Sequence, residues 1–120
     1  MADDASELRR INEEIGGKEA EGDAQFFLKL LASEFAFRRA SGAVVDALAF
    51  LKGIGDGKPR KSAVVEPIQV FGDRAIVECV VTLGDGNDAK RYHNLRLFVR
   101  ASSSEAWQLL GWANEEAKRP

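Results

Sequence analysis

The hydrophobic pattern of this chain changes about half-way along its length. Up to about Lys52, apolar residues recur every three or four positions, as on one side of a helix. From Ala63 to Ala113, apolar and polar residues alternate between tight turns, which is typical of antiparallel strands. The chain therefore predicts helices followed by a curled antiparallel sheet. Helices that close over one face of such a sheet leave a cup in which a ligand could sit.

The first half predicts three helices and one short extended segment. The first helix carries the apolar stripe Leu8, Ile11 and Ile15 in a charged segment, and Gly16-Gly17 should stop or kink it. The other elements are an 18–32 helix, an edge strand or extended turn over 34–39, and a 44–52 helix with Val44, Leu48 and Leu51 on one side.

The turn Gly72-Asp73 sets the register of the first two long strands. Glycine at the first central position favours a two-residue type II′ hairpin, which pairs Phe71 with Arg74 and Glu66 with Cys79. Paired residues share a face of the sheet. One face is then almost wholly apolar and contains Val64, Ile68, Val70, Ala75, Val77 and Val81.

The register after the next turn depends on its length. A five-residue loop over 84–88 pairs Cys79 with His93 and places Leu95, Leu97 and Val99 on the apolar face. A four-residue loop places Asn94 and Arg96 there instead, where two unpartnered polar groups would cost roughly 1–3 kcal/mol each. We therefore expect the five-residue register. The last strand, 107–113, has no fixed register: either Trp107 and Leu109 or Leu110 and Trp112 face inward.

In this register Glu66, Cys79 and His93 form one row on the apolar face. The row could transfer protons, or it could be a polar patch at the mouth of a pocket with Cys79 as a small buried hydrophobe. Pro67 could mark a bulge, which would move Glu66 to the other face.

The opposite face predicts an interface. It carries a contiguous mixture of apolar and basic residues, which favours a homodimer formed through the outer side of the sheet. The candidates are Ile76, Val80, Tyr92, Arg96, Phe98 and Arg100.

Composition narrows the classes of function. The chain has 120 residues, of which 45% are hydrophobic, and this suits a single domain over 1–120 with loose ends at 1–4 and 115–120. A net charge of −2 argues against binding to nucleic acid or to an anionic membrane surface, and no apolar run is long enough to span a bilayer. The one cysteine suits a reducing cytoplasm. No spacing of ligands or glycines indicates a metal or a cofactor.

Several segments resemble the NTF2-like superfamily, and most closely its small SnoaL-like and DUF4440-type bacterial members. The resemblance spans about Ala5 to Asn114 and rests on segments 31–42, 50–51, 70–77, 94–100 and 107–112. It implies an α+β cone in which three N-terminal helices pack on a curved antiparallel sheet. It also implies a pocket, and frequent dimerisation through the sheet. The acid–base Tyr and Asp pair of the related isomerases has no counterpart here, because Tyr92 falls on the outer face in the expected register.

These observations predict a cone that binds a small hydrophobic molecule. The expected apolar lining is Phe27, Phe35, Cys79, Leu97 and Trp112, and the expected polar contacts are Glu66, His93 and Arg38. The alternative is an enzyme that uses Glu66 and His93 for acid–base chemistry on a hydrophobic substrate.

Overall fold

The computed structural model describes residues 3–54, 60–84 and 86–117. Its elements in chain order are α1 (Asp4–Glu21), α2 (Ala24–Leu30), β1 (Leu31–Arg38), β2 (Val44–Asp46), α3 (Ala47–Gly53), β3 (Arg60–Phe71), β4 (Arg74–Leu83), the 3-10 turn η1 (Gly86–Asp88), β5 (Lys90–Val99) and β6 (Gln108–Glu116). Regular structure thus includes Asp4 and residues 115–116, which were expected to be loose. Residues 1–2 and 118–120 lie outside the described part.

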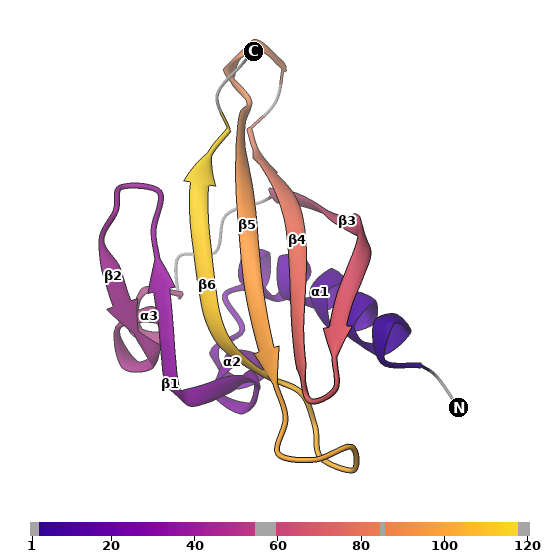
Figure 1. The fold of residues 1–120 in the computed structure, drawn as a ribbon. Coiled ribbons are helices and arrows are strands. Elements are labelled where there is room, and N and C mark those ends of the chain that lie inside the picture. Colours follow the sequence, from indigo (N-terminus) through magenta and orange to yellow (C-terminus); the bar gives the residue numbers. More distant parts are fainter. Residues whose placement is uncertain (1–2, 55–59, 85, 118–120) are drawn as a thin grey trace.

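The three α-helices of the described part lie on one side of a six-stranded sheet in the order β2-β1-β6-β5-β4-β3 (Figure 1). The α+β architecture is confirmed, and β3 to β6 form the predicted antiparallel run. The sheet as a whole is mixed, because β1 pairs with β6 in parallel.

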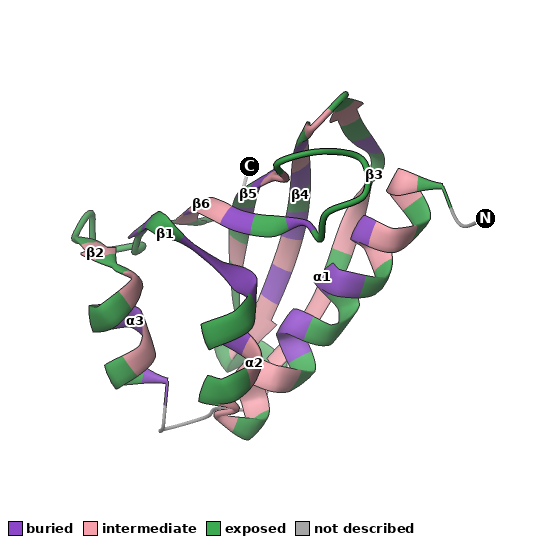
Figure 2. Ribbon diagram, turned by 90° about the horizontal axis from the view of Figure 1, so that it is seen from below, coloured by how far each residue is buried: buried purple, intermediate pink, exposed green. Residues whose placement is uncertain are grey.

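Helix α1 continues through Gly16-Gly17, where a stop or a kink was predicted. A Cβ on Gly16 would come within 3.3 Å of Ser62 Cβ on β3, so the glycine lets the helix approach the sheet closely. The helix begins at the N-cap Asp3 and ends at Gly22, whose φ of 69° is left-handed. Its buried residues face the sheet (Figure 2).

The segments between α1 and β3 differ more from the prediction. The second helix is only Ala24–Leu30, and the chain then enters β1, which lies inside the sheet because β2 occupies the edge. The third helix begins at Ala47, capped by Asp46, and it buries Phe50 while Leu48 is 62% exposed. The predicted stripe is therefore wrong in part: Val44 belongs to β2 and Leu48 is exposed, whereas Leu51 packs against the core.

The predicted hairpin at Gly72-Asp73 is confirmed. Phe71 pairs with Arg74, and Gly72 has a φ of 62°. Farther from the turn, between Gln69 and Val65, the register shifts, so that Val64 and not Glu66 pairs with Cys79. Irregular pairing begins around Pro67, whose peptide bond with Glu66 is cis. The bulge considered for Pro67 is thus present.

The preferred register of β5 was wrong. Leu83 pairs with Lys90, Cys79 with Asn94 and Val77 with Arg96. The loop is one residue longer than expected, so the opposite set of β5 side chains faces the helices. Tyr92, Asn94, Arg96 and Phe98 point inward, whereas His93, Leu95 and Leu97 point outward.

Strand β6 combines the two alternatives left open for it. Phe98 pairs with Leu109 and Leu97 pairs with Gly111, so Leu110 is an extra residue in the strand. This bulge changes the alternation, and Trp107, Leu109 and Trp112 are all buried.

A candidate binding site inside the cone

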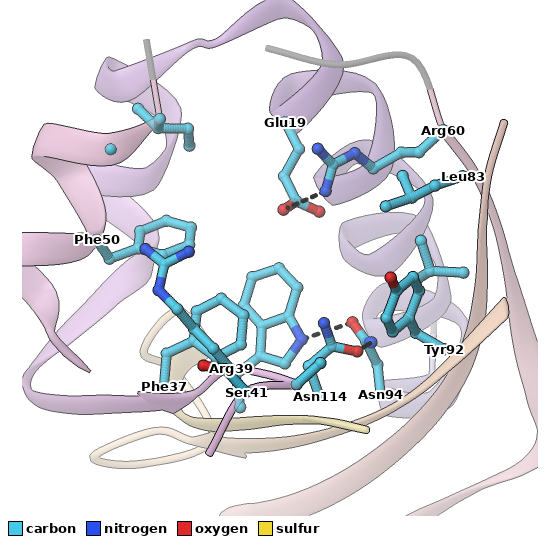
Figure 3. Close-up of a pocket in the computed structure, with 15 residues that line it drawn as sticks. Glu19, Phe37, Arg39, Ser41, Phe50, Arg60, Leu83, Tyr92, Asn94 and Asn114 are labelled. Carbon is cyan, nitrogen blue, oxygen red and sulfur yellow. Dashed lines mark hydrogen bonds and ion pairs between the residues drawn. The ribbon is translucent and has the colours of Figure 1, made fainter. Parts of the chain in front are cut away.

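A cavity of about 380 Å³ lies between the inner face of the sheet and the helices (Figure 3). Side chains from α1, α3, the end of β1 and β3 to β6 surround it. Its lining residues are Glu19, Phe37, Arg39, Ala40, Ser41, Phe50, Gly53, Ile54, Arg60, Val81, Leu83, Tyr92, Asn94, Trp112 and Asn114.

One wall of the cavity is aromatic. Phe37 from β1 stacks on Trp112 from β6, with ring centroids 4.9 Å apart and planes inclined by 10°. Phe50 from α3 lies 5.8 Å from Trp112 and 5.7 Å from Phe37. Parallel neighbours β1 and β6 bring the first two rings together, and α3 adds the third. The wall offers flat apolar surface to a ring or an alkyl chain.

The opposite wall is polar and carries a largely buried ion pair. Arg60 Nη1 lies 3.0 Å from Glu19 Oε2, and the Glu19 side chain is only 11% exposed. Burial raises the pKa of Glu19, while the positive charges of Arg60 and Arg96 pull that pKa down. Glu19 is the one carboxyl among the described lining residues, and its burial favours the protonated form.

The floor of the cavity is a hydrogen-bonded network centred on Asn94. Asn94 Oδ1 accepts bonds from Trp112 Nε1 at 2.5 Å and Arg96 Nη2 at 3.1 Å, and Asn94 Nδ2 donates to Asn114 Oδ1 at 2.8 Å. Arg96 Nη1 also donates to Asn12 Oδ1 of α1 at 2.9 Å. The Arg96 guanidinium lies 4.5 Å from the centre of the Trp112 ring. The network thus fixes the rotamers of the whole floor.

Cys79 lies beneath this floor as a buried free thiol. Its sulfur is 3.8 Å from Asn12 Oδ1. Burial raises the pKa of the thiol above its usual range, although the positive charge of Arg96 opposes this. Cys79 therefore stays protonated at neutral pH and lacks the thiolate that nucleophilic catalysis requires.

Comparison with solved structures identifies the architecture. An NTF2-like protein from Cytophaga hutchinsonii superposes with a TM-score of 0.81 at 12% identity, over 97% of this chain and 100% of that one. The CaMKII hub of S. rosetta gives 0.77 at 24% identity, over 98% and 99% of the two chains. The chain has the NTF2-like fold. A protein from Parabacteroides distasonis described as a candidate ketosteroid isomerase gives 0.75 at 13% identity, over 97% and 89%.

These similarities concern the NTF2-like fold and not its chemistry. No protein-family model matches the chain, and no curated protein matches it significantly. Across residues 3–54, 60–84 and 86–117, no helix combines the length and apolarity needed to cross a membrane. The same residues contain no group of three or more His, Cys, Asp or Glu side chains arranged to hold a metal ion.

The NTF2-like cone brings together few of the residues expected in its pocket. Trp112 lines the cavity and Cys79 lies below it, whereas Phe27 and Phe35 are buried in the core around Phe50. These two rings fill the space under α2 and α3, so they stabilise the fold without facing the cavity.

The other expected pocket residues lie outside the cone. His93 and Leu97 are exposed on the outer face because β5 has the opposite register. Glu66 is exposed at the bulge and forms an ion pair with Arg9 of α1. Arg38 is also exposed, and its guanidinium donates to the backbone oxygen of Asn114. The row of Glu66, Cys79 and His93 therefore does not exist.

Four of the expected interface residues also face the wrong way. Tyr92 lines the cavity, Arg96 and Phe98 are fully buried on the inner face, and Arg100 forms ion pairs with Asp4 and Asp73. Ile76 and Val80 are the two that lie on the outer face. No Asp is among the described cavity residues, so the Tyr and Asp pair of the isomerases is still missing although Tyr92 points inward.

The sequence held two signals for the residues that were missed. Asn12 and Glu19 continue the stripe of Leu8, Ile11 and Ile15 at helical spacing, which places both polar groups on the face of α1 that turns to the sheet. Asn94 and Arg96 were the inward residues of the rejected register. Facing inward is unfavourable for these two residues only if they lack partners, and α1 and β6 supply those partners.

Proposed function

We propose that the cone binds a small molecule that has an apolar or aromatic body and one polar group. The observation that carries this proposal is the cavity of about 380 Å³ with an aromatic wall on one side and fixed polar groups on the other. Natural small-molecule pockets of this size combine apolar surface with polar groups at fixed positions, and in this cavity the polar share is large. The SnoaL-like or DUF4440-type assignment remains part of the proposal and rests on the sequence segments that resemble those proteins.

The test is a titration of the isotope-labelled protein with small aromatic probes, namely indole, phenol and phenylacetamide, followed by NMR. Shift changes should concentrate at Trp112, Phe37 and Asn114. Leu83→Trp places a ring in the cavity and should abolish the changes. His93→Ala, on the outer face, is the control and should leave them intact. Shift changes confined to the outer face, or none with any probe, would contradict the proposal.

A second candidate is acid–base catalysis by Glu19 on a hydrophobic substrate. The supporting observation is that burial raises the pKa of a carboxyl that faces the cavity. Glu66 and His93, which the sequence suggested for this role, are exposed and do not line the cavity. Glu19→Gln keeps the shape of the side chain and should abolish proton exchange on a bound carbon acid while leaving its affinity nearly unchanged. Unchanged exchange would remove this candidate.

We also propose a homodimer through the outer face of the sheet. An apolar groove of about 280 Å³ crosses this face, with Leu95 52% exposed and Leu97 36% exposed. The exposed residues around it include Arg38 and Arg74 together with Glu78 and Glu115, so two copies related by a two-fold axis can match opposite charges. A cytoplasmic location stays part of the proposal, since Cys79 is a free thiol.

Sedimentation velocity tests the dimer. Leu95→Glu should convert it to a monomer of about half the mass. Leu28→Glu is the matched control, because Leu28 is 59% exposed on α2, on the helix side of the sheet. A 13.1 kDa species for the unmodified chain at micromolar concentration would contradict the proposal.

A further inference from the structure

The most unusual charge in the cone is Arg96, whose side chain is fully buried. Its guanidinium donates to two neutral amide oxygens, those of Asn12 and Asn94, and its Nε has no hydrogen-bond partner. In the described part of the chain no carboxylate lies within ion-pair distance of it, and the cavity carboxylate Glu19 is already paired with Arg60. Glu19 therefore acts on Arg96 only at longer range, and a buried cation with no counter-ion in contact favours a further anion nearby.

Arg96 sets the orientation of the amide groups at the cavity surface through a chain of hydrogen bonds. Arg96 and Trp112 both donate to Asn94 Oδ1, which leaves Asn94 Nδ2 as the group that faces Asn114. Asn94 Nδ2 therefore donates to Asn114 Oδ1. The Asn114 amide must then present its nitrogen to the cavity, and Figure 3 shows this nitrogen turned toward the open centre. Arg96 and Trp112 orient the Asn94 amide, Asn94 orients the Asn114 amide, and the floor thus presents Asn114 Nδ2 as a hydrogen-bond donor.

A second cation lies at the side of the cavity. Arg39 lines it with its guanidinium 5.7 Å from the centre of the Phe37 ring, and it forms no ion pair with any described residue. Arg39 and Arg96 thus leave the described lining and its floor with an excess of positive charge. Such a site rejects a cation and favours an acceptor that carries negative charge.

Building on the proposed binding function, we propose that the polar group of the ligand is a carboxylate. The carboxylate accepts a hydrogen bond from Asn114 Nδ2 at the floor, and the apolar body of the ligand lies against Phe37 and Trp112. Asn114 is the contact residue. Arg96 and Asn94 are positioning residues, because they act only through the orientation of the Asn114 amide.

The test compares acids with their neutral amides. Benzoate, phenylacetate and 3-phenylpropionate are titrated beside benzamide, phenylacetamide and 3-phenylpropionamide, and cavity shifts are followed by NMR at constant ionic strength. At least one acid should bind about tenfold more tightly than its amide, as expected for a charge-assisted hydrogen bond. Asn114→Asp keeps the acceptor for Asn94 but replaces the donor by a carboxylate, so the preference for the acid should be lost or reversed.

Control variants distinguish a general effect of charge from the role of Asn114, and the outcomes distinguish the carboxylate inference from the binding function. Asn87→Asp makes the same charge change on the exposed turn η1 and should keep the preference, and Asn114→Ala should reduce it without adding charge. Amides that bind as tightly as acids to the unmodified protein would overturn the carboxylate inference and leave the binding function standing. Acids that keep their advantage in Asn114→Asp would overturn the role of Asn114. Failure of every probe would overturn the binding function and this inference with it.

Discussion

The buried Arg96 network makes a quantitative prediction about stability. Asn12→Leu preserves the size of the side chain and removes the acceptor of Arg96 Nη1. Arg96→Met keeps an extended side chain and removes the charge. The double variant replaces both partners by apolar groups, so no buried charge loses its acceptor on α1, and only the weak donor Cys79 Sγ does. Comparing the three measures how far the two side chains depend on each other.

The structure allows a rough magnitude for each step. Asn12→Leu leaves a buried guanidinium donor without its partner, and it should lower the free energy of unfolding by about 3 kcal/mol. Arg96→Met leaves only neutral amide oxygens with fewer donors, and Asn94 keeps its bond from Trp112, so we expect a loss of about 1–2 kcal/mol. The double variant should lose about 2 kcal/mol, well below the sum of the single changes.

Urea denaturation followed by tryptophan fluorescence provides the assay. With a slope of about 2 kcal/mol/M, Asn12→Leu should move the midpoint down by about 1.5 M, and adding Arg96→Met should restore part of this shift. Leu48→Met on the exposed side of α3 is a control that should change little. Additivity of the two losses within about 0.5 kcal/mol would refute the reasoning, because it would mean that Asn12 does not compensate the buried charge.

Three further predictions concern single groups. The Glu19 carboxyl should titrate above its ordinary value of 4.5 in an NMR pH series, because burial raises its pKa. The pKa of Glu19 is therefore higher in the folded protein than in the unfolded chain. Ionised Glu19 lowers the free energy of unfolding, and this loss is absent below the unfolded pKa and develops as the pH rises through the folded pKa. A titration midpoint at or below 4.5 would contradict this prediction. Cys79 should react with a thiol reagent at pH 8 only as fast as the protein unfolds, since its pKa is raised by burial, and rapid labelling of the native protein would count against a closed core. Gly22→Ala should lower stability by about 1 kcal/mol in thermal unfolding, because Gly22 has a left-handed φ of 69°, whereas Gly17→Ala inside α1 should not.

Local patterns in the sequence determined the type of most elements and the position of some turns, although they did not reveal β2. The stripe of Leu8, Ile11 and Ile15 predicted the buried face of α1, and Gly72 predicted the hairpin between β3 and β4. Both signals are short-range, since a helical period or a two-residue turn depends on neighbours along the chain. From them the α+β arrangement and the inner face of β4 followed, because β4 alternates without a bulge.

Tertiary structure alone decided which side chains of β5 point into the cone. The side chains of β5 that point inward depend on loop length and on whether buried polar groups find partners. The partner of Arg96 is Asn12, which lies 84 residues away on another element. With that acceptor absent, burying Arg96 would cost several kcal/mol; with Asn12, Asn94 and Trp112 around it, the polar register holds. From the sequence, the free-energy cost of burying a polar side chain can be judged only for each residue separately. Whether hydrogen bonds offset that cost depends on which distant groups the fold brings together.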